Sequence, residues 1–147
     1  AFALGADFRI AAEQVKITTA FAGVGLSADS ASSWWLPRIV GTARAKELLL
    51  LSPTLTAAEA LELGLVTEVV PADQVLPRAQ QLAARMAAGP TTAYGAIRRA
   101  VAYSAAHDLP ASLEHEGELM ALTGHTDDHR RAVKSFLAKQ QPTFSGR

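Results

Sequence analysis

The sequence predicts an α/β fold in which a mixed first half is followed by an entirely helical second half. Alternation of apolar and polar residues, which is typical of strands, occurs only before Pro71. From Ala72 onward the chain contains helical patterns separated by helix-breaking residues such as the Gly89-Pro90 pair. We therefore expect residues 1–71 to form the mixed core and residues 72–147 to form a helical region.

Composition is typical of a globular protein that binds neither nucleic acid nor a membrane. The chain has 147 residues, of which 49% are hydrophobic, so one domain can bury a sizeable core. Its 14 basic and 14 acidic residues balance, which leaves no positive field to attract nucleic acid or anionic lipid. The absence of cysteine excludes disulfides and is compatible with a reducing compartment. Since no apolar run approaches the roughly 20 residues of a membrane span, we expect a soluble cytoplasmic protein.

The first elements are predicted to be a helix end and two short strands. Residues 1–6 read like the last turns of a helix already under way, and the chain starts with Ala1 rather than Met, so we expect a fragment. Residues 7–12 and 15–21 alternate in polarity, which favours strands. Further on, Thr42 can cap a helix over residues 43–51.

A capping-box pattern predicts the next helix. Thr56 and Glu59 have the spacing at which two side chains satisfy the first amides of a helix reciprocally. The helix would reach Leu63, with Gly64 as its left-handed C-terminal residue. Residues 65–70 are β-branched and follow as a strand.

The second half contains four helical patterns and a tail. Asp108 and Thr126 are the predicted caps of the last two helices. The expected helices cover residues 75–88, 91–105, 108–122 and 126–137, and the tail covers 140–147.

One loop concentrates the features of a candidate site. Residues 25–41 lie between two glycines, contain both tryptophans and hold a single acid, Asp29. A glycine-bounded turn lets backbone approach a ligand closely. Trp34 and Trp35 are adjacent and cannot share a helix face, so we expect one to pack inward and the other to line a pocket or interface. Asp29 could instead be the N-cap of a helix that begins near Ser30.

Two other motifs have structural explanations that we prefer. Residues 23–28 fit the loose pattern G-x-G-x-x-A of dinucleotide-binding folds, but the region about 20 residues later reads as helix where a Rossmann unit needs a strand. His125 and His129, with Asp127 and Asp128, could suggest a metal cluster. Acids in a first helical turn satisfy exposed amides, so we expect a solvated helix N-terminus and no metal.

Five stretches of the chain, in order, carry a resemblance to a known family. They are Ala-Asp-Phe-Arg-Ile-Ala-Ala at 6–12, Gly-Leu-Ser-Ala-Asp-Ser with Trp-Leu-Pro-Arg-Ile-Val-Gly within 25–41, Ala-Lys-Glu-Leu-Leu at 45–49, Ala-x-Glu-Ala-x-x-x-Gly-Leu-Val ending at Val66, and Thr-Asp-Asp-His-Arg-x-x-Val-x-x-Phe at 126–136. Together they resemble the C-terminal half of the crotonase family, the enoyl-CoA hydratase/isomerase superfamily. The resemblance implies that residues 1–71 are the C-terminal part of a spiral of ββα units. The helices of residues 72–147 would then build a homo-oligomer, a trimer or hexamer.

The same resemblance implies chemistry on acyl-CoA thioesters, in which two backbone amides stabilise an enolate. Hydratases of the family carry two glutamates, at positions that match Ala1 and Phe21, and this chain has neither. Members with the pattern Gly-Leu-x-Pro-Asp-x-Gly-Gly use one aspartate, which shuttles a proton during double-bond isomerisation in several of them. Asp29 matches that aspartate, whereas Ala28 replaces the proline and Ala31-Ser32 replaces the glycine pair.

The resemblance also implies binding residues. Phe136 and Lys139 match a phenylalanine and a lysine that lie near the adenine and phosphates of CoA, although core packing and a solvated face are alternative roles. Phe21, Leu26 and Trp34 are expected to line the substrate pocket.

The sequence therefore predicts an enzyme of the enoyl-CoA isomerase type, with Asp29 as the general acid/base. Its substrate would be a coenzyme A thioester, with no metal and no redox cofactor. Two alternatives stay open, which are an enoyl-CoA hydratase with weak activity and a non-catalytic crotonase-like assembly module.

Overall fold

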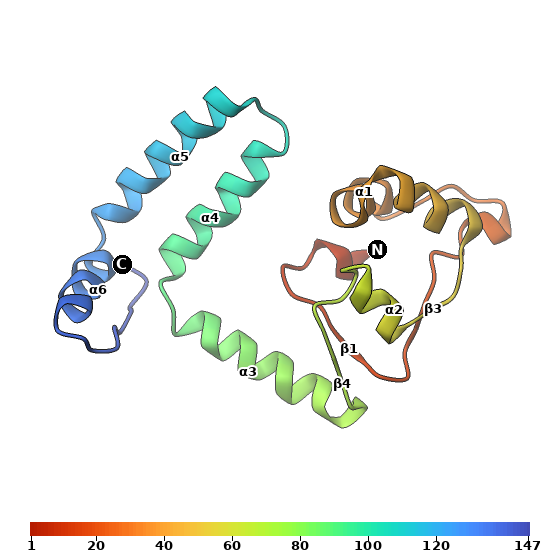
Figure 1. The fold of residues 1–147 in the computed structure, drawn as a ribbon, viewed down its shortest axis with the longest axis horizontal. Coiled ribbons are helices and arrows are strands. Elements are labelled where there is room, and N and C mark those ends of the chain that lie inside the picture. Colours follow the sequence, from red (N-terminus) through yellow and green to blue (C-terminus); the bar gives the residue numbers. More distant parts are fainter. The chain divides into compact units, whose positions relative to one another are not determined.

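The computed structural model describes all of residues 1–147, which fold as two compact units (Figure 1). The first unit, Ala1–Gln80, contains every strand, and the second unit, Gln81–Arg147, contains no strand. The boundary falls inside helix α3 (Val75–Ala87). The expected assignment of residues 1–71 to a spiral core and of 72–147 to an oligomerisation region stays a prediction.

The first unit combines two small sheets with helices. Strand β1 pairs with β4 in parallel, with Ile10 opposite Glu68, and β2 pairs with β3 antiparallel, with Lys16 opposite Thr56. In chain order its elements before α3 are η1 (Phe2–Gly5), β1 (Ile10–Ala12), β2 (Lys16–Ile17), η2 (Ala22–Val24), α1 (Ser32–Leu51), β3 (Leu55–Thr56), α2 (Ala57–Glu62), β4 (Glu68–Val70) and η3 (Ala72–Gln74).

The strands are shorter than the alternation predicts, because side-chain hydrogen bonds replace the ladder at their ends. Before β1, the Arg9 amide donates to the Thr67 hydroxyl at 2.9 Å. After β2, the hydroxyl of Thr18 donates to the carbonyl of Ser52 at 3.1 Å, and that of Thr19 donates to the carbonyl of Leu48 at 2.8 Å. The chain between β2 and η2 is therefore attached to the end of α1 rather than to a neighbouring strand.

Helix α1 consists of two helical stretches joined at Gly41. This glycine has φ 76° and ψ 159°, which are not helical values. Its second stretch ends at Leu51, where the helix predicted over residues 43–51 also ends. At the chain start, the expected helix end is a short 3₁₀ turn, η1.

The capping box before α2 is confirmed. The Thr56 hydroxyl accepts from the Glu59 amide at 3.3 Å, and the Glu59 carboxylate accepts from the Thr56 amide at 2.7 Å. Gly64 has φ 72°, the left-handed conformation expected of it.

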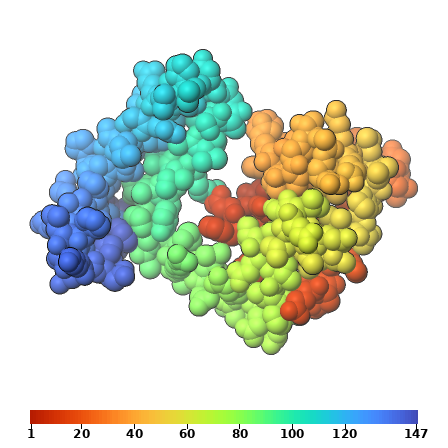
Figure 2. All heavy atoms as spheres, in the orientation of Figure 1, coloured from red at the N-terminus to blue at the C-terminus, as the bar shows by residue number.

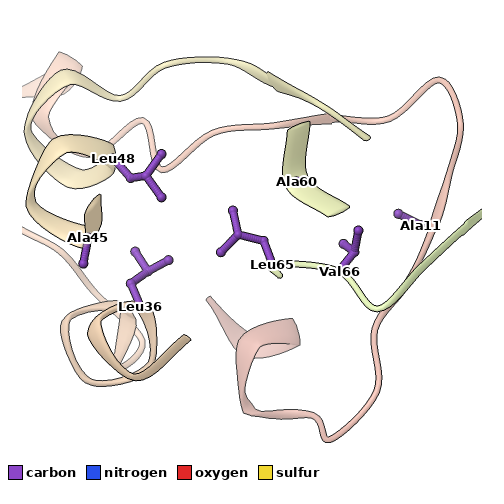
Figure 3. Packing of buried hydrophobic residues seen from close by; sticks show 7 residues of the cluster. All are labelled: Ala11, Leu36, Ala45, Leu48, Ala60, Leu65 and Val66. Atoms are coloured by element: carbon purple, nitrogen blue, oxygen red, sulfur yellow. The ribbon is translucent and has the colours of Figure 1, made fainter. Parts of the chain in front are cut away.

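The core of the first unit lies where α1 meets α2 and the turn after it. Leu36 and Leu48 come from the two stretches of α1 and lie in one cluster with Leu65 from that turn (Figure 3). Both α1 leucines are less than 5% exposed. The remaining buried members of this cluster are Ala11, Ala45, Ala60 and Val66. The long loop between η2 and α1 is therefore followed by a firmly packed helix.

The second unit is built on a helical hairpin. Helices α4 (Thr91–Ser104) and α5 (Leu109–Gly124) pack side by side, and α6 (Asp127–Leu137) follows α5 (Figures 1 and 2). The predicted caps are confirmed, since Asp108 accepts from the Ala111 amide at 3.0 Å and Thr126 accepts from the His129 amide at 3.1 Å. None of the helices combines the length and the apolar character needed to cross a membrane.

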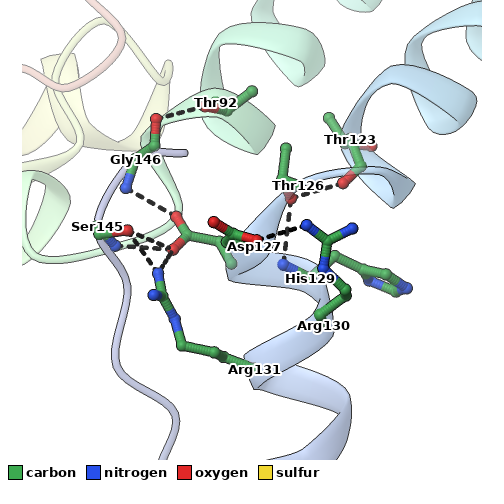
Figure 4. Close-up of polar contacts among 10 residues, drawn as sticks. Thr92, Thr123, Thr126, Asp127, His129, Arg130, Arg131, Ser145 and Gly146 are labelled. Carbon is green, nitrogen blue, oxygen red and sulfur yellow. Dashed lines mark hydrogen bonds and ion pairs between the residues drawn. The ribbon is translucent and has the colours of Figure 1, made fainter.

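The C-terminal tail is fixed to this unit through Asp128. Its carboxylate accepts hydrogen bonds from the amides of Ser145 and Gly146, both at 2.8 Å, and pairs with Arg131. The Gly146 carbonyl accepts from the Thr92 hydroxyl of α4 at 3.0 Å (Figure 4). The tail therefore links the start of α4 to the start of α6.

Candidate functional site

Of the predicted site stretch, residues 25–41, the part from Ser32 onward belongs to α1, and the remaining loop runs from η2 to α1 through three left-handed residues. Gly25 has φ 73°, while Ser30 and Ala31 have φ 51° and 61°. Left-handed conformations cost energy at residues other than glycine, so contacts elsewhere must hold this turn. Asp29 precedes the turn and is exposed.

Asp29 is not the N-cap of α1, so the alternative role considered for it is wrong. Helix α1 begins at Ser32, its N-cap is Ala31, and no side chain caps it. The Asp29 carboxylate instead accepts from the amide of Ser30. The two left-handed residues place the carboxylate before the helix start, where it stays accessible to solvent.

The Asp29 backbone is held by Ser32. The Asp29 carbonyl accepts from the Ser32 amide at 2.9 Å and from the Ser32 hydroxyl at 2.6 Å. Ser32 is only 3% exposed. The loop is thus attached to the first residue of the helix.

A cavity of about 570 Å³ lies in the first unit. Most of its lining is apolar, and Ser32 and Phe21 both contribute to it. Leu36, Leu48 and Leu65 of the core also line it. A largely apolar cavity with a few polar groups at its wall is suited to an apolar part of a ligand.

The three residues predicted for the substrate pocket lie in different surroundings. Phe21 lines the cavity, whereas Leu26 and Trp34 do not. The Phe21 carbonyl accepts from the Leu26 amide at 3.0 Å, which closes the turn around η2. The role of these residues in substrate binding stays a prediction.

Trp35 packs inward, as expected for one of the two adjacent tryptophans, whereas Trp34 does not line the cavity. Trp35 is partly buried, and its ring lies 3.4 Å from where a Cβ of Gly5 would be. Trp34 is 50% exposed, and the Arg38 guanidinium lies 3.3 Å from its ring centroid. Such a cation–π contact contributes about 0.5–1 kcal/mol at an exposed site.

The two predicted CoA-binding residues belong to the second unit. Phe136 is 81% exposed on α6, and the Lys139 amide donates to the Phe136 carbonyl at 3.0 Å. Lys139 itself has φ 55°. Since Phe136 is exposed, it does not pack in the core of this unit, and a CoA-binding role for either residue stays a prediction.

The acids near His125 and His129 have structural partners. Asp127 pairs with Arg130, whose hydrogen bond and positive charge hold the pKa of that carboxyl below its usual range. The His125 ring donates a hydrogen bond from Nδ1 to the Ala121 carbonyl at 2.6 Å. No group of three or more potential metal ligands comes together in the structure.

Sequence reasoning missed the hydrogen bonds that the side chains of Arg9 and Ser32 make. The Arg9 guanidinium donates to three carbonyls, those of Ala6 at 2.6 Å, Gly64 at 3.2 Å and Leu65 at 2.7 Å. The sequence alone does not show these bonds, because the carbonyls of Gly64 and Leu65 lie more than 50 residues from Arg9 along the chain. Ser32 was visible in the sequence as a small hydroxyl within the site loop, but its partner depends on where α1 begins.

Comparison with known proteins gives the family. The sequence matches the enoyl-CoA hydratase/isomerase family over residues 1–147. It is 39% identical over 145 residues to the 1,2-epoxyphenylacetyl-CoA isomerase of Escherichia coli, covering 99% of this chain and 55% of that protein. It is also 39% identical to an enoyl-CoA hydratase of Rhodobacter capsulatus, covering 56% of that protein. The chain thus spans about half the length of the curated relatives it matches.

Solved structures agree with this. A crystal structure of an enoyl-CoA hydratase/isomerase from Mycobacterium abscessus has a TM-score of 0.95 and 43% identity, over 99% of this chain and 56% of that one. An enoyl-CoA hydratase from Bacillus anthracis has a TM-score of 0.90 at 30% identity. The α/β fold class predicted from the sequence, the C-terminal part of a crotonase-type fold, is confirmed. The chain belongs to the enoyl-CoA hydratase/isomerase family.

Proposed function

We propose that the protein carrying this chain moves a double bond in an enoyl-CoA thioester, with Asp29 as the general acid/base. In this reaction the Asp29 carboxylate takes a proton from the carbon next to the thioester carbonyl of a 3-enoyl-CoA. The resulting dienolate receives the proton at the far end of the double bond, which leaves a 2-enoyl-CoA. The proton returns to carbon, so one carboxylate is sufficient and no redox cofactor or metal takes part.

The observation that carries this proposal is that the Asp29 carboxylate is exposed and lies before α1. The carboxylate does not cap α1, and the Asp29 carbonyl is bound to Ser32 at the wall of the apolar cavity. The positions of the two family glutamates hold Ala1 and Phe21 instead. A single carboxylate favours proton transfer between two carbons over the addition of water, which usually employs two.

The test is isomerisation by the whole protein that carries this chain. We expect it to convert a 3-enoyl-CoA or 2,5-dienoyl-CoA to its conjugated isomer, followed by absorbance. Asp29→Asn should lower kcat by about 10²–10⁴-fold, the usual contribution of a general acid/base. Asp73→Asn is the matched control, because Asp73 is an exposed acid of the same unit outside the site loop. Equal turnover of Asp29→Asn and the unchanged protein would rule out the role.

Two further outcomes would favour the alternatives. Release of 3-hydroxyacyl-CoA much faster than isomerisation would favour the hydratase, an activity named for the Rhodobacter capsulatus relative. A stable oligomer that gives no heat with acetyl-CoA in isothermal titration would favour an assembly module. Either result would be obtained with the same protein preparation.

CoA binding, assembly and location belong to the same proposal. Phe136 and Lys139 would contact the adenine and phosphates of CoA, and exposure of the Phe136 ring supports this. A homo-oligomer, trimer or hexamer, is supported by large apolar side chains exposed on the helices of the second unit, such as Ile97, Val101 and Leu113. The absence of cysteine supports a cytoplasmic location.

A further inference from the structure

The turn that follows Asp29 is conformationally unfavourable, and the side chain of Ser32 helps to close it. Ser30 and Ala31 are both left-handed, with φ 51° and 61°, although neither is a glycine. Such residues persist only where the surroundings hold them. The Ser32 hydroxyl provides the one side-chain hydrogen bond to the Asp29 carbonyl, at 2.6 Å, in addition to the backbone bond at 2.9 Å.

Ser32 is itself held by the packing of helix α1. It is 3% exposed and is the first residue of α1, one turn before Leu36, which is 2% exposed in the core. Because Ser32 belongs to the packed helix, its hydrogen bond to the Asp29 carbonyl fixes the position of the loop relative to that helix. Asp29 is therefore held relative to the cavity wall through Ser32 rather than through its own side chain.

We propose that Ser32 is a positioning residue for Asp29, which rests on the function proposed above. Its hydroxyl does not touch the Asp29 carboxylate. It fixes the peptide that carries the carboxylate and stabilises a turn that glycines would adopt without strain. Because proton transfer depends steeply on the placement of the acid/base, loss of this bond lowers turnover more than substrate affinity.

The test compares Ser32→Ala and Ser32→Gly with Ser33→Ala in the whole protein. Both Ser32 variants lack the hydroxyl. Ser32→Ala keeps the Cβ atom and its packing contacts, whereas Ser32→Gly removes them as well. Ser33 is the adjacent serine, is exposed and has no side-chain hydrogen bond. We expect both Ser32 variants to lose about tenfold or more in kcat with less than about twofold change in KM, and Ser33→Ala to match the unchanged protein.

Hydrogen exchange provides a readout that does not depend on activity. The amide of Ser32 should exchange about fivefold faster or more in Ser32→Ala, the effect of losing one neutral hydrogen bond nearby, and at the unchanged rate in Ser33→Ala. If Asp29→Asn abolishes turnover while both Ser32 variants retain it, the positioning role is wrong and the proposed function stands. If the unchanged protein has no isomerase activity, the proposed function fails, and the positioning role fails with it. Unaltered exchange in Ser32→Ala would show that the hydroxyl does not hold the turn.

Discussion

Arg9 shows how a single side chain can replace missing sheet structure in this protein. Strand β1 has only three residues, so its parallel pairing with β4 supplies few backbone hydrogen bonds. The Arg9 guanidinium adds bonds to the carbonyls of Gly64 and Leu65, at the end of α2, and to that of Ala6. A guanidinium can do this because its donors diverge in a fixed plane, which lysine cannot reproduce.

Replacing Arg9 by Gln should destabilise the first unit by about 1–3 kcal/mol, because hydrogen bonds from a charged donor contribute that much and the carbonyls lose their partner. Both tryptophans lie in this unit, so unfolding in urea can be followed by tryptophan fluorescence. Arg44→Gln is the matched control. It removes a pair with Glu47 whose side chains are 48% and 47% exposed, and we expect a change below about 0.5 kcal/mol. Equal midpoints for the two variants would contradict the role of Arg9.

At the scale of elements, local signals were sufficient where a boundary depends on nearby residues. The capping box at Thr56, the left-handed Gly64 and the caps Asp108 and Thr126 all stand where the sequence predicts them. The strands could not be delimited in this way, because a strand ends where its partner ends. Helix α1 was expected to begin near Ser30 but begins at Ser32, because Ala31 takes a left-handed conformation that no local sequence signal indicates.

The cap of α2 gives a prediction with a pH dependence. Thr56→Ala should cost about 1 kcal/mol, and Thr54→Ala, an exposed threonine outside the cap, close to nothing. The Thr56 amide and hydroxyl lower the pKa of Glu59. This contribution to stability is complete above the unfolded-state value of about 4.3 and is lost as the pH falls through the lower folded-state pKa. Thr56→Ala removes the hydroxyl bond to Glu59 but keeps the amide bond, so its urea midpoints at pH 7 and at pH 3 should differ less than those of the unchanged protein, by the share of the hydroxyl alone.

The packing of α1 gives a second prediction at this scale. Leu48 is 4% exposed in the core, whereas Leu50, two residues later in the same helix, is 72% exposed. Leu48→Ala should cost about 2–5 kcal/mol through lost burial and the added cavity, and Leu50→Ala under about 1 kcal/mol. The urea midpoint followed by tryptophan fluorescence measures both, and a similar loss in the two variants would contradict the assignment of the core.

At the scale of the whole chain, the two units are stabilised in different ways. The first has a buried apolar cluster around α1 and α2, whereas the buried apolar side chains of the second are Ala96 and Leu119, beside the polar contacts of its caps and tail. Asp128 is the clearest of these, since a carboxylate that is 3% exposed needs several donors to stay charged. Its donors include the amides of Ser145 and Gly146, so these tail residues are attached to the rest of the second unit.

The last prediction concerns this attachment of the tail. Burial opposes ionisation of Asp128, but the amides of Ser145 and Gly146 and the Arg131 guanidinium outweigh it, so the pKa of this carboxyl lies below its usual range. The tail should therefore stay attached above the unfolded-state value of about 3.9 and be released as the pH falls through the lower folded-state pKa. Asp128→Asn should release it at neutral pH, because the side-chain amide of Asn cannot accept both bonds. Amide exchange at Ser145 and Gly146 should then rise at least about tenfold. Asp127→Asn, which alters only an exposed pair with Arg130, should leave that exchange unchanged, and equal exchange in both variants would show that Asp128 does not hold the tail.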